Sequence, residues 1–374
     1  MERWFSAANP QNHLRLLTLC AIASRAVTVS LLWLNDPISP LTSSLLRWDA
    51  FHFAQIAKEG YVYEQQWAFL PEGPPGWIDI LQGGGLAALV CDSTLTLYRL
   101  SLLHLQSPSL ALIASLLSLL PSSPAILHFA GYSEPFFTFL SYKGMLSCAR
   151  QQWFSAACYF MLASIFRSNG ILLGGFLLYG LIVQSFLRGK IPSRFAPFIF
   201  HQYTAYYIFC NPCEPNVIPP SWCTKKIPSI YTHVQSHYWN VGFLRYWTIS
   251  QSPNILLASP VLALLFTFSI THLINAVPPL FHASKLGVIV PSSPFFTESL
   301  IPHAIHAIVL SSALLFASHT QIALRLAASM PITYWAAAWL ITERPWWGRM
   351  WIAWSVVWGA AISVVLWAVF LPPA

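Results

Sequence analysis

The first long stretch between apolar runs holds a candidate acid, Asp49, three positions before His52. Residues three apart share one face of a helix, and Ser43 or the serine after it could cap a short helix that runs to about Lys58. That helix is apolar on most sides, so we expect it to lie along a membrane surface. A carboxylate beside bulky apolar residues is suited to acid–base work at a lipid surface. The alternative is that Asp49 pairs with Arg47 or caps a turn.

Three further residues are candidates for chemistry. Glu64 is a second acid in the same stretch of chain. Glu134 falls inside an apolar run, where an ionisable group is a functional hypothesis by default; it could hold substrate hydroxyl groups or pair with a basic residue. Arg167 stands between two apolar runs and suits binding of an anion, although an arginine at a helix end can also snorkel to the membrane surface.

The composition indicates that these residues belong to an integral membrane protein. Hydrophobic residues make up 56% of the 374 positions and charged residues 8%, whereas soluble domains carry about 25% charged residues. The net charge of +7 comes from basic residues scattered singly between apolar runs. This pattern is typical of the cytoplasmic excess of Lys and Arg on membrane proteins and does not indicate a nucleic-acid partner. No cluster of acids resembles a metal site, so we predict none.

The apolar runs predict an all-α polytopic protein with about ten to eleven transmembrane helices. The candidate spans are 14–34, 81–103, 109–120, 125–142, 151–166, 170–187, 195–210, 254–276, 301–318, 321–341 and 350–370. The first has no small-residue cleavage pattern and is interpreted as an uncleaved signal anchor. We treat residues 1–374 as a single membrane domain.

The basic connections predict the orientation of the spans, because cytoplasmic loops are enriched in Lys and Arg. Alternation from a cytoplasmic N-terminus places four basic connections on the cytoplasmic side: 188–194, Lys143 with Arg150, Lys285, and Arg344 with Arg349. Two long segments, 35–80 and 211–253, then face the lumen. Long ordered loops usually carry function, so we expect the active site in the luminal loop 35–80, with 211–253 as a second functional loop.

Several ordered blocks make the chain similar to one family. They are Arg47-Trp48-Asp49-Ala50, Gly60-Tyr61-x-Tyr63-Glu64, Ala68-Phe69-Leu70-Pro71, Ala130-Gly131-Tyr132-Ser133-Glu134, Arg167-Ser168-Asn169-Gly170, Gln202-Tyr203-x-Ala205-Tyr206-x-x-Phe209-Cys210, Trp222-Cys223, Tyr238-Trp239-Asn240-Val241-Gly242-Phe243-Leu244 and Pro331-Ile332-x-Tyr334-Trp335. Together they resemble the PIG-V family, the GPI mannosyltransferase 2 enzymes. The chain departs from the family pattern after Pro71, and its segments 195–210 and 277–300 are shorter.

The resemblance implies a GT-C type glycosyltransferase fold with its active site at the luminal face of the endoplasmic reticulum membrane. The implied reaction adds the second mannose, in α1,6 linkage, to the GPI-anchor precursor. The donor is dolichyl-phosphate mannose, and no cofactor is expected. The implied partners are these two lipid substrates, the membrane and, as in the fungal branch of the family, an accessory membrane subunit that nothing in the sequence identifies.

The resemblance also suggests roles. The donor mannose is β-linked to phosphate and the product is α-linked, so a single inverting displacement suffices. Asp49 matches the family's acid and is assigned as general base; Glu64 is the second catalytic candidate, and Arg167 is assigned to the phosphate. We assign the following residues to substrate binding: Trp48, His52, Glu134, Arg167, Asn169, Tyr238, Trp239 and Asn240.

The cysteines of the second luminal loop allow two interpretations. Cys210 and Cys213, with two histidines further on, mimic a zinc pattern, but the gap is longer than a zinc finger uses. The family pattern matches Cys210 and Cys223, and the lumen oxidises thiols, so the resemblance implies a disulfide between those two.

Three other functions stay open at this level. A GT-C transferase with a different acceptor would share fold and donor, although the block at 238–243 argues against it. A secondary transporter would be expected to show two related halves, which the sequence lacks. A non-catalytic membrane subunit would tolerate loss of Asp49.

Overall fold

The computed structural model describes residues 10–35, 92–120, 133–183, 210, 223, 243–278 and 293–368. Within these ranges the regular structure is helical and contains no strand, which confirms the all-α prediction. Several predicted site residues lie outside the described residues: Trp48, Asp49, His52, Glu64, Tyr238, Trp239 and Asn240. The same holds for the loop 35–80 beyond its first residue and for most of the loop 211–253.

Four helical stretches of the described chain are long and apolar enough to cross a membrane: Pro10–Leu31, Ile249–Ala276, Glu298–Phe316 and Pro345–Trp367. They contain α1 (Pro10–Asn35), α13 (Ser252–Ala276), α15 (Ile301–Phe316), and α18 (Pro345–Trp354) with its π-helical continuation Ser355–Ile362 and α19 (Ser363–Ala368). These stretches confirm a polytopic membrane protein. The total of ten to eleven transmembrane helices stays a prediction, because four is a number for the described ranges alone.

The remaining helices are shorter than the spans expected from the sequence. They are α5 (Ser93–Leu105), α6 (Pro108–Leu117), α7 (Glu134–Ala149), α8 (Trp153–Phe166), α9 (Gly174–Leu178), α16 (Ile322–Leu326) and α17 (Pro331–Glu343). A transmembrane helix needs about 20 residues at 1.5 Å per residue. In α5 the shortening has a local cause, since the Asp92 carboxylate accepts the Leu95 N–H at 3.2 Å and caps the helix at Ser93.

Two predicted boundaries were wrong. The span 321–341 is broken into α16, a 3₁₀ turn at Ala327–Ser329 and α17. The cause is Pro331: it has no N–H to donate, and it keeps Met330 extended at φ −103° and ψ 109°. The span 125–142 was placed too early, because α7 runs from Glu134 to Ala149. Lys143 therefore lies within a helix and not in a basic connection.

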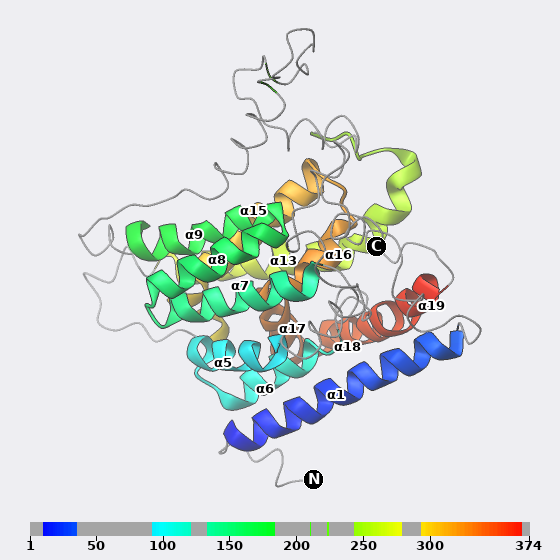
Figure 1. Cartoon of the computed structure of the whole chain (residues 1–374), viewed down its shortest axis with the longest axis horizontal. Helices are drawn as coiled ribbons and strands as arrows, with labels where there is room; N and C mark the ends of the chain where they lie inside the picture. The colour runs from blue at the N-terminus through cyan, green and yellow to red at the C-terminus, as the bar shows by residue number, and fades with distance from the viewer. Residues whose placement is uncertain are drawn as a thin grey trace.

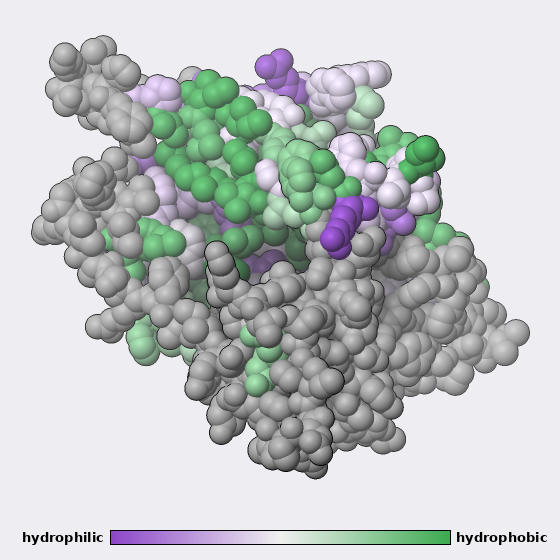
Figure 2. Space-filling model, turned by 90° about the horizontal axis from the view of Figure 1, so that it is seen from above, coloured by the Kyte–Doolittle hydropathy of each residue, from purple (hydrophilic) through white to green (hydrophobic). Residues whose placement is uncertain are grey.

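Figure 1 shows α7, α8 and α9 side by side, with α5 next to α7, α6 next to α5, and α1 along the edge beside α6 and α19. Trp335 of α17 lies fully buried in the core, where its indole N–H donates to Ser101 Oγ of α5 at 2.7 Å. On the face shown in Figure 2, the described part of the surface carries patches of hydrophobic residues, in green, with hydrophilic residues between them. Exposed large side chains such as Phe154 on α8 and Leu256 on α13 are suited to contact with lipid.

Polar contacts lie at both ends of α17. At its C-terminal end, Ser293 Oγ donates to Glu343 Oε1 at 2.5 Å. Shortly before α15, Thr297 donates to the His104 carbonyl at 3.3 Å. At the N-terminal end of α17, Tyr142 donates its hydroxyl hydrogen to the Ala328 carbonyl at 2.6 Å. The candidate site lies beside this N-terminal end of α17.

Candidate functional site

Three charged side chains from three separate segments meet beside the N-terminal end of α17. Arg167 Nη1 donates to Glu134 Oε1 at 2.5 Å, and Arg325 Nε donates to the same oxygen at 2.6 Å. A second nitrogen of Arg325, Nη2, also contacts that oxygen. We call Glu134, Arg167 and Arg325 the arginine–glutamate cluster. It joins the first residue of α7, the residue after α8, and α16.

The local sequence explains the place of Arg167. Helix α8 ends at Phe166, and Arg167 is extended before the 3₁₀ turn Ser168–Leu173. The Gly170 N–H closes this turn on the Arg167 carbonyl at 2.9 Å. A Cβ at Gly170 would stand 2.6 Å from the Ser164 Cα, so only glycine allows the turn to pack this closely against α8.

Neighbouring contacts hold the other two members of the cluster. Phe136 and Phe166 stack with ring centroids 5.3 Å apart, which joins the start of α7 to the end of α8. On the side of Arg325, Thr333 Oγ1 donates to the Ala327 carbonyl at 2.8 Å and fixes the turn between α16 and α17. The break at Pro331 thus places Arg325 across from Glu134.

Among the described residues, the cluster brings two guanidinium groups to one carboxylate. It is also shielded from water: the side chains of Arg167, Arg325 and Glu134 keep 16%, 15% and 8% of their exposure. Charges are expensive to bury unless paired, so the carboxylate and the two guanidinium groups stabilise one another in this shielded place. Guanidinium groups bind phosphate through several N–H donors in a planar fork. The arrangement is therefore suited to accept an anion.

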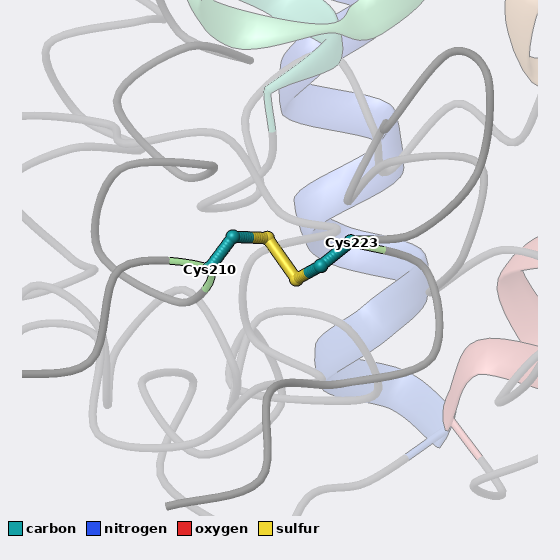
Figure 3. Close-up of a disulfide and its surroundings, with 2 residues drawn as sticks. All are labelled: Cys210 and Cys223. Atoms are coloured by element: carbon teal, nitrogen blue, oxygen red, sulfur yellow. A yellow bond between two sulfur atoms is a disulfide. The ribbon is translucent and has the colours of Figure 1, made fainter. Parts of the chain in front are cut away.

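Cys210 and Cys223 form a disulfide across 13 positions of sequence (Figure 3), with the two Cα atoms 5.6 Å apart. Both cysteines belong to blocks that carry the family resemblance. In the part of the chain that the structure describes, no group of three His, Cys, Asp or Glu side chains could hold a metal ion.

Comparisons with known proteins identify the family. The model of the mannosyltransferase (PIG-V) family matches residues 4–81, 86–191 and 176–374. A GPI mannosyltransferase 2 from Cryptococcus neoformans is 34% identical over 88% of this chain and 88% of its own length. The GPI alpha-1,6-mannosyltransferase 2 of Rattus norvegicus is 32% identical over 82% of this chain and 75% of its own, and that of Homo sapiens is 29% identical over 92% and 81%. No solved structure matches the chain.

The chain belongs to the PIG-V mannosyltransferase family. It is therefore a glycosyltransferase, as the sequence blocks predicted. Among the predicted site residues of this mannosyltransferase, the structure brings Glu134 and Arg167 into direct contact. Asn169 lies two residues after Arg167 in the 3₁₀ turn and is partly buried.

Arg325 was not predicted from the sequence, although it contacts Glu134 through two nitrogens and Arg167 does so through one. A signal was present, because Arg325 interrupts the run 321–341, which was interpreted as an apolar span. The rule that selected Glu134, that ionisable residues within apolar runs are rare and functional, applies equally to this arginine.

Proposed function

We propose that this PIG-V family member transfers the second mannose, in α1,6 linkage, from dolichyl-phosphate mannose to the GPI-anchor precursor. The relatives' names support this acceptor and linkage: they are GPI mannosyltransferase 2 and GPI alpha-1,6-mannosyltransferase 2. The transfer takes place at the luminal face of the endoplasmic reticulum membrane, with the N-terminus in the cytoplasm. An accessory membrane subunit is a further proposed partner.

One structural observation carries the proposal: two arginines share a single buried carboxylate. A mannosyl phosphate donor releases a lipid phosphate, whose negative charge grows as the sugar–oxygen bond breaks. Fixed positive groups in a shielded site stabilise such a charge far better than water does. Arg167 and Arg325 supply that charge, while Glu134 holds their guanidinium groups in place.

The proposed reaction is one displacement with inversion at the mannose C1. The acceptor hydroxyl oxygen forms a bond to C1, and the bond from C1 to the phosphate oxygen breaks with its electron pair going to the phosphate. Asp49 takes the hydroxyl proton as general base. Glu64 orients the acceptor, and Trp48, His52 and Asn169 bind the substrates together with the loop residues Tyr238, Trp239 and Asn240.

Complementation of cells that lack this transferase tests the proposal. Such cells should accumulate the GPI precursor with a single mannose, and the wild-type chain should restore GPI-anchored proteins to the surface. Asp49→Asn keeps the size of the side chain and removes the base, which should lower the rate by about 10² to 10⁴ and abolish the rescue at normal protein level. Glu64→Gln should weaken activity less.

The outcomes separate the alternatives. Full rescue by Asp49→Asn would end its assignment as the base. Accumulation of a different lipid-linked sugar in the deficient cells would indicate another acceptor. A normal set of GPI precursors in those cells would rule out the proposed function.

A further inference from the structure

A short segment, Phe243–Gln251, leads from the second predicted luminal loop into α13. It binds the end of α15 through two donors. The backbone N–H of Leu244 donates to the Phe316 carbonyl at 2.6 Å, and the Trp247 indole N–H donates to the Leu315 carbonyl at 2.7 Å. Carbonyl groups in the last turn of a helix have no partner within the helix. The segment therefore caps α15.

The backbone of this segment is strained at the contact. Leu244 has φ 57°, in the left-handed region that residues other than glycine seldom adopt. A residue stays in such a conformation only where its surroundings impose it. The bonds from Leu244 and Trp247 to α15 hold the segment in this conformation, so its position on α15 is closely defined.

The same segment reaches the next turn of the chain. The rings of Tyr246 and His319 lie with centroids 4.7 Å apart, and Asn254 donates to the Tyr246 hydroxyl oxygen at 3.2 Å. The His319 carbonyl accepts the N–H of Ile322, the first residue of α16, at 3.0 Å. Three residues later, Arg325 binds Glu134. Contacts therefore run without a gap from the loop segment to the arginine–glutamate cluster.

We propose that Tyr246 and Trp247 are positioning residues that act through Arg325. With Leu244 they form a clamp that fixes the end of α15 and the turn at His319, and so sets where α16 presents Arg325. The proposal rests on the proposed function, in which Arg325 stabilises the donor phosphate. It also ties the phosphate-binding end of the bundle to the loop that carries Tyr238, Trp239 and Asn240.

Steady-state kinetics test the clamp. Trp247→Phe keeps a ring and removes the N–H donor to α15. In microsomes from deficient cells that express the variant, we expect the apparent KM for dolichyl-phosphate mannose to rise about two- to tenfold, the effect of one lost hydrogen bond. Inhibition by dolichyl phosphate should weaken by the same factor. The kcat per enzyme, measured against an immunoblot, should fall as well, because Arg325 also stabilises the charge that develops on the leaving phosphate. Trp347→Phe, at an exposed position on α18, is the matched control and should leave KM unchanged.

A second pair of variants keeps the test decisive if Trp247→Phe fails to accumulate. Tyr246→Leu removes the ring beside His319 and leaves both donors to α15, so the donor KM should rise again. Tyr246→Phe retains the ring and should restore most of the wild-type KM.

Unchanged donor KM in Trp247→Phe and Tyr246→Leu, with only less protein present, would show a structural role and overturn the inference. Absence of mannose transfer by the wild-type chain would instead refute the proposed function itself.

Discussion

Two glutamates lie near the two ends of α17 and differ in their burial and in their hydrogen-bond donors. Glu134, near the N-terminal end, is buried and shared by the guanidinium groups of Arg167 and Arg325. Glu343, at the C-terminal end, is exposed and accepts hydrogen bonds from uncharged donors, Ser293 Oγ at 2.5 Å and the Trp339 indole at 2.8 Å. The difference illustrates that a buried carboxylate needs positively charged partners, whereas an exposed carboxylate does not.

The arginines give the buried end of α17 several N–H donors. Two guanidinium groups gather there around Glu134, and their planar forks suit phosphate oxygens. Glu343 lies where water screens its charge and, among the described residues, accepts from uncharged donors only. Of the two ends of α17, the N-terminal end is therefore the one suited to bind an anion, and three predictions test this contrast.

The largest effect is expected from Arg325→Met. The substitution leaves Glu134 paired with Arg167, so the protein should still accumulate and insert. It removes one of the two guanidinium groups, and loss of one electrostatic donor at a developing negative charge typically lowers kcat by about 10² to 10³. Mannose transfer to the single-mannose precursor in microsomes measures the loss. Arg325→Lys keeps the charge without the planar fork and should fall in between. Activity of Arg325→Met within tenfold of wild type would contradict a role for the cluster in the reaction.

A smaller effect is expected from Gly170→Ala, which tests how tightly Arg167 is held. The added Cβ meets the backbone of Ser164, an atom that cannot turn away as a side chain can. Overpacking of this kind costs about 1 to 3 kcal/mol, and the turn must move Arg167 away from Glu134. The thermal midpoint of the solubilised protein and its mannose transfer should both fall.

Gly175→Ala is the matched control for that turn, since nothing lies within 4 Å of a Cβ at this position. It should leave stability and activity close to wild type. Equal effects of the two substitutions would show that the close packing at Gly170 is unimportant for the cluster.

The sequence predicted the long helices well because their apolar runs are continuous. The spans 14–34, 254–276 and 301–318 agree within a few residues with α1, α13 and α15. It failed where one residue overrides an apolar run. Asp92 caps α5 from within a candidate span, and Pro331 divides another. Hydropathy averages over such residues, whereas capping and the missing proline N–H act at a single position.

Two residues of the site could be predicted from the sequence, but their contacts with each other and with Arg325 could not. Glu134 and Arg167 were selected because an ionisable residue within or between apolar runs is unusual. Their contact joins positions 33 apart, and that of Glu134 with Arg325 joins positions 191 apart. Neither pairing has a signal in local spacing, because each depends on how α7, α8 and α16 pack. The role of Arg325 follows only from that packing.

The smallest effect is expected from Glu343→Gln. The glutamine amide oxygen can still accept one of the two hydrogen bonds, and the site is open to water, so the loss in stability should stay below about 1 kcal/mol. Donor KM, kcat and the thermal midpoint should remain near wild type. This substitution removes a negative charge at one end of α17, whereas Arg325→Met removes a positive charge at the other, so the two change the net charge by one unit in opposite directions. If Glu343→Gln lowered mannose transfer as strongly, loss of any charged side chain at an end of α17 would suffice, and the contrast between the two ends would fail. A normal rate in Glu343→Gln, together with a large loss in Arg325→Met, would show that mannose transfer depends on the charges of the arginine–glutamate cluster.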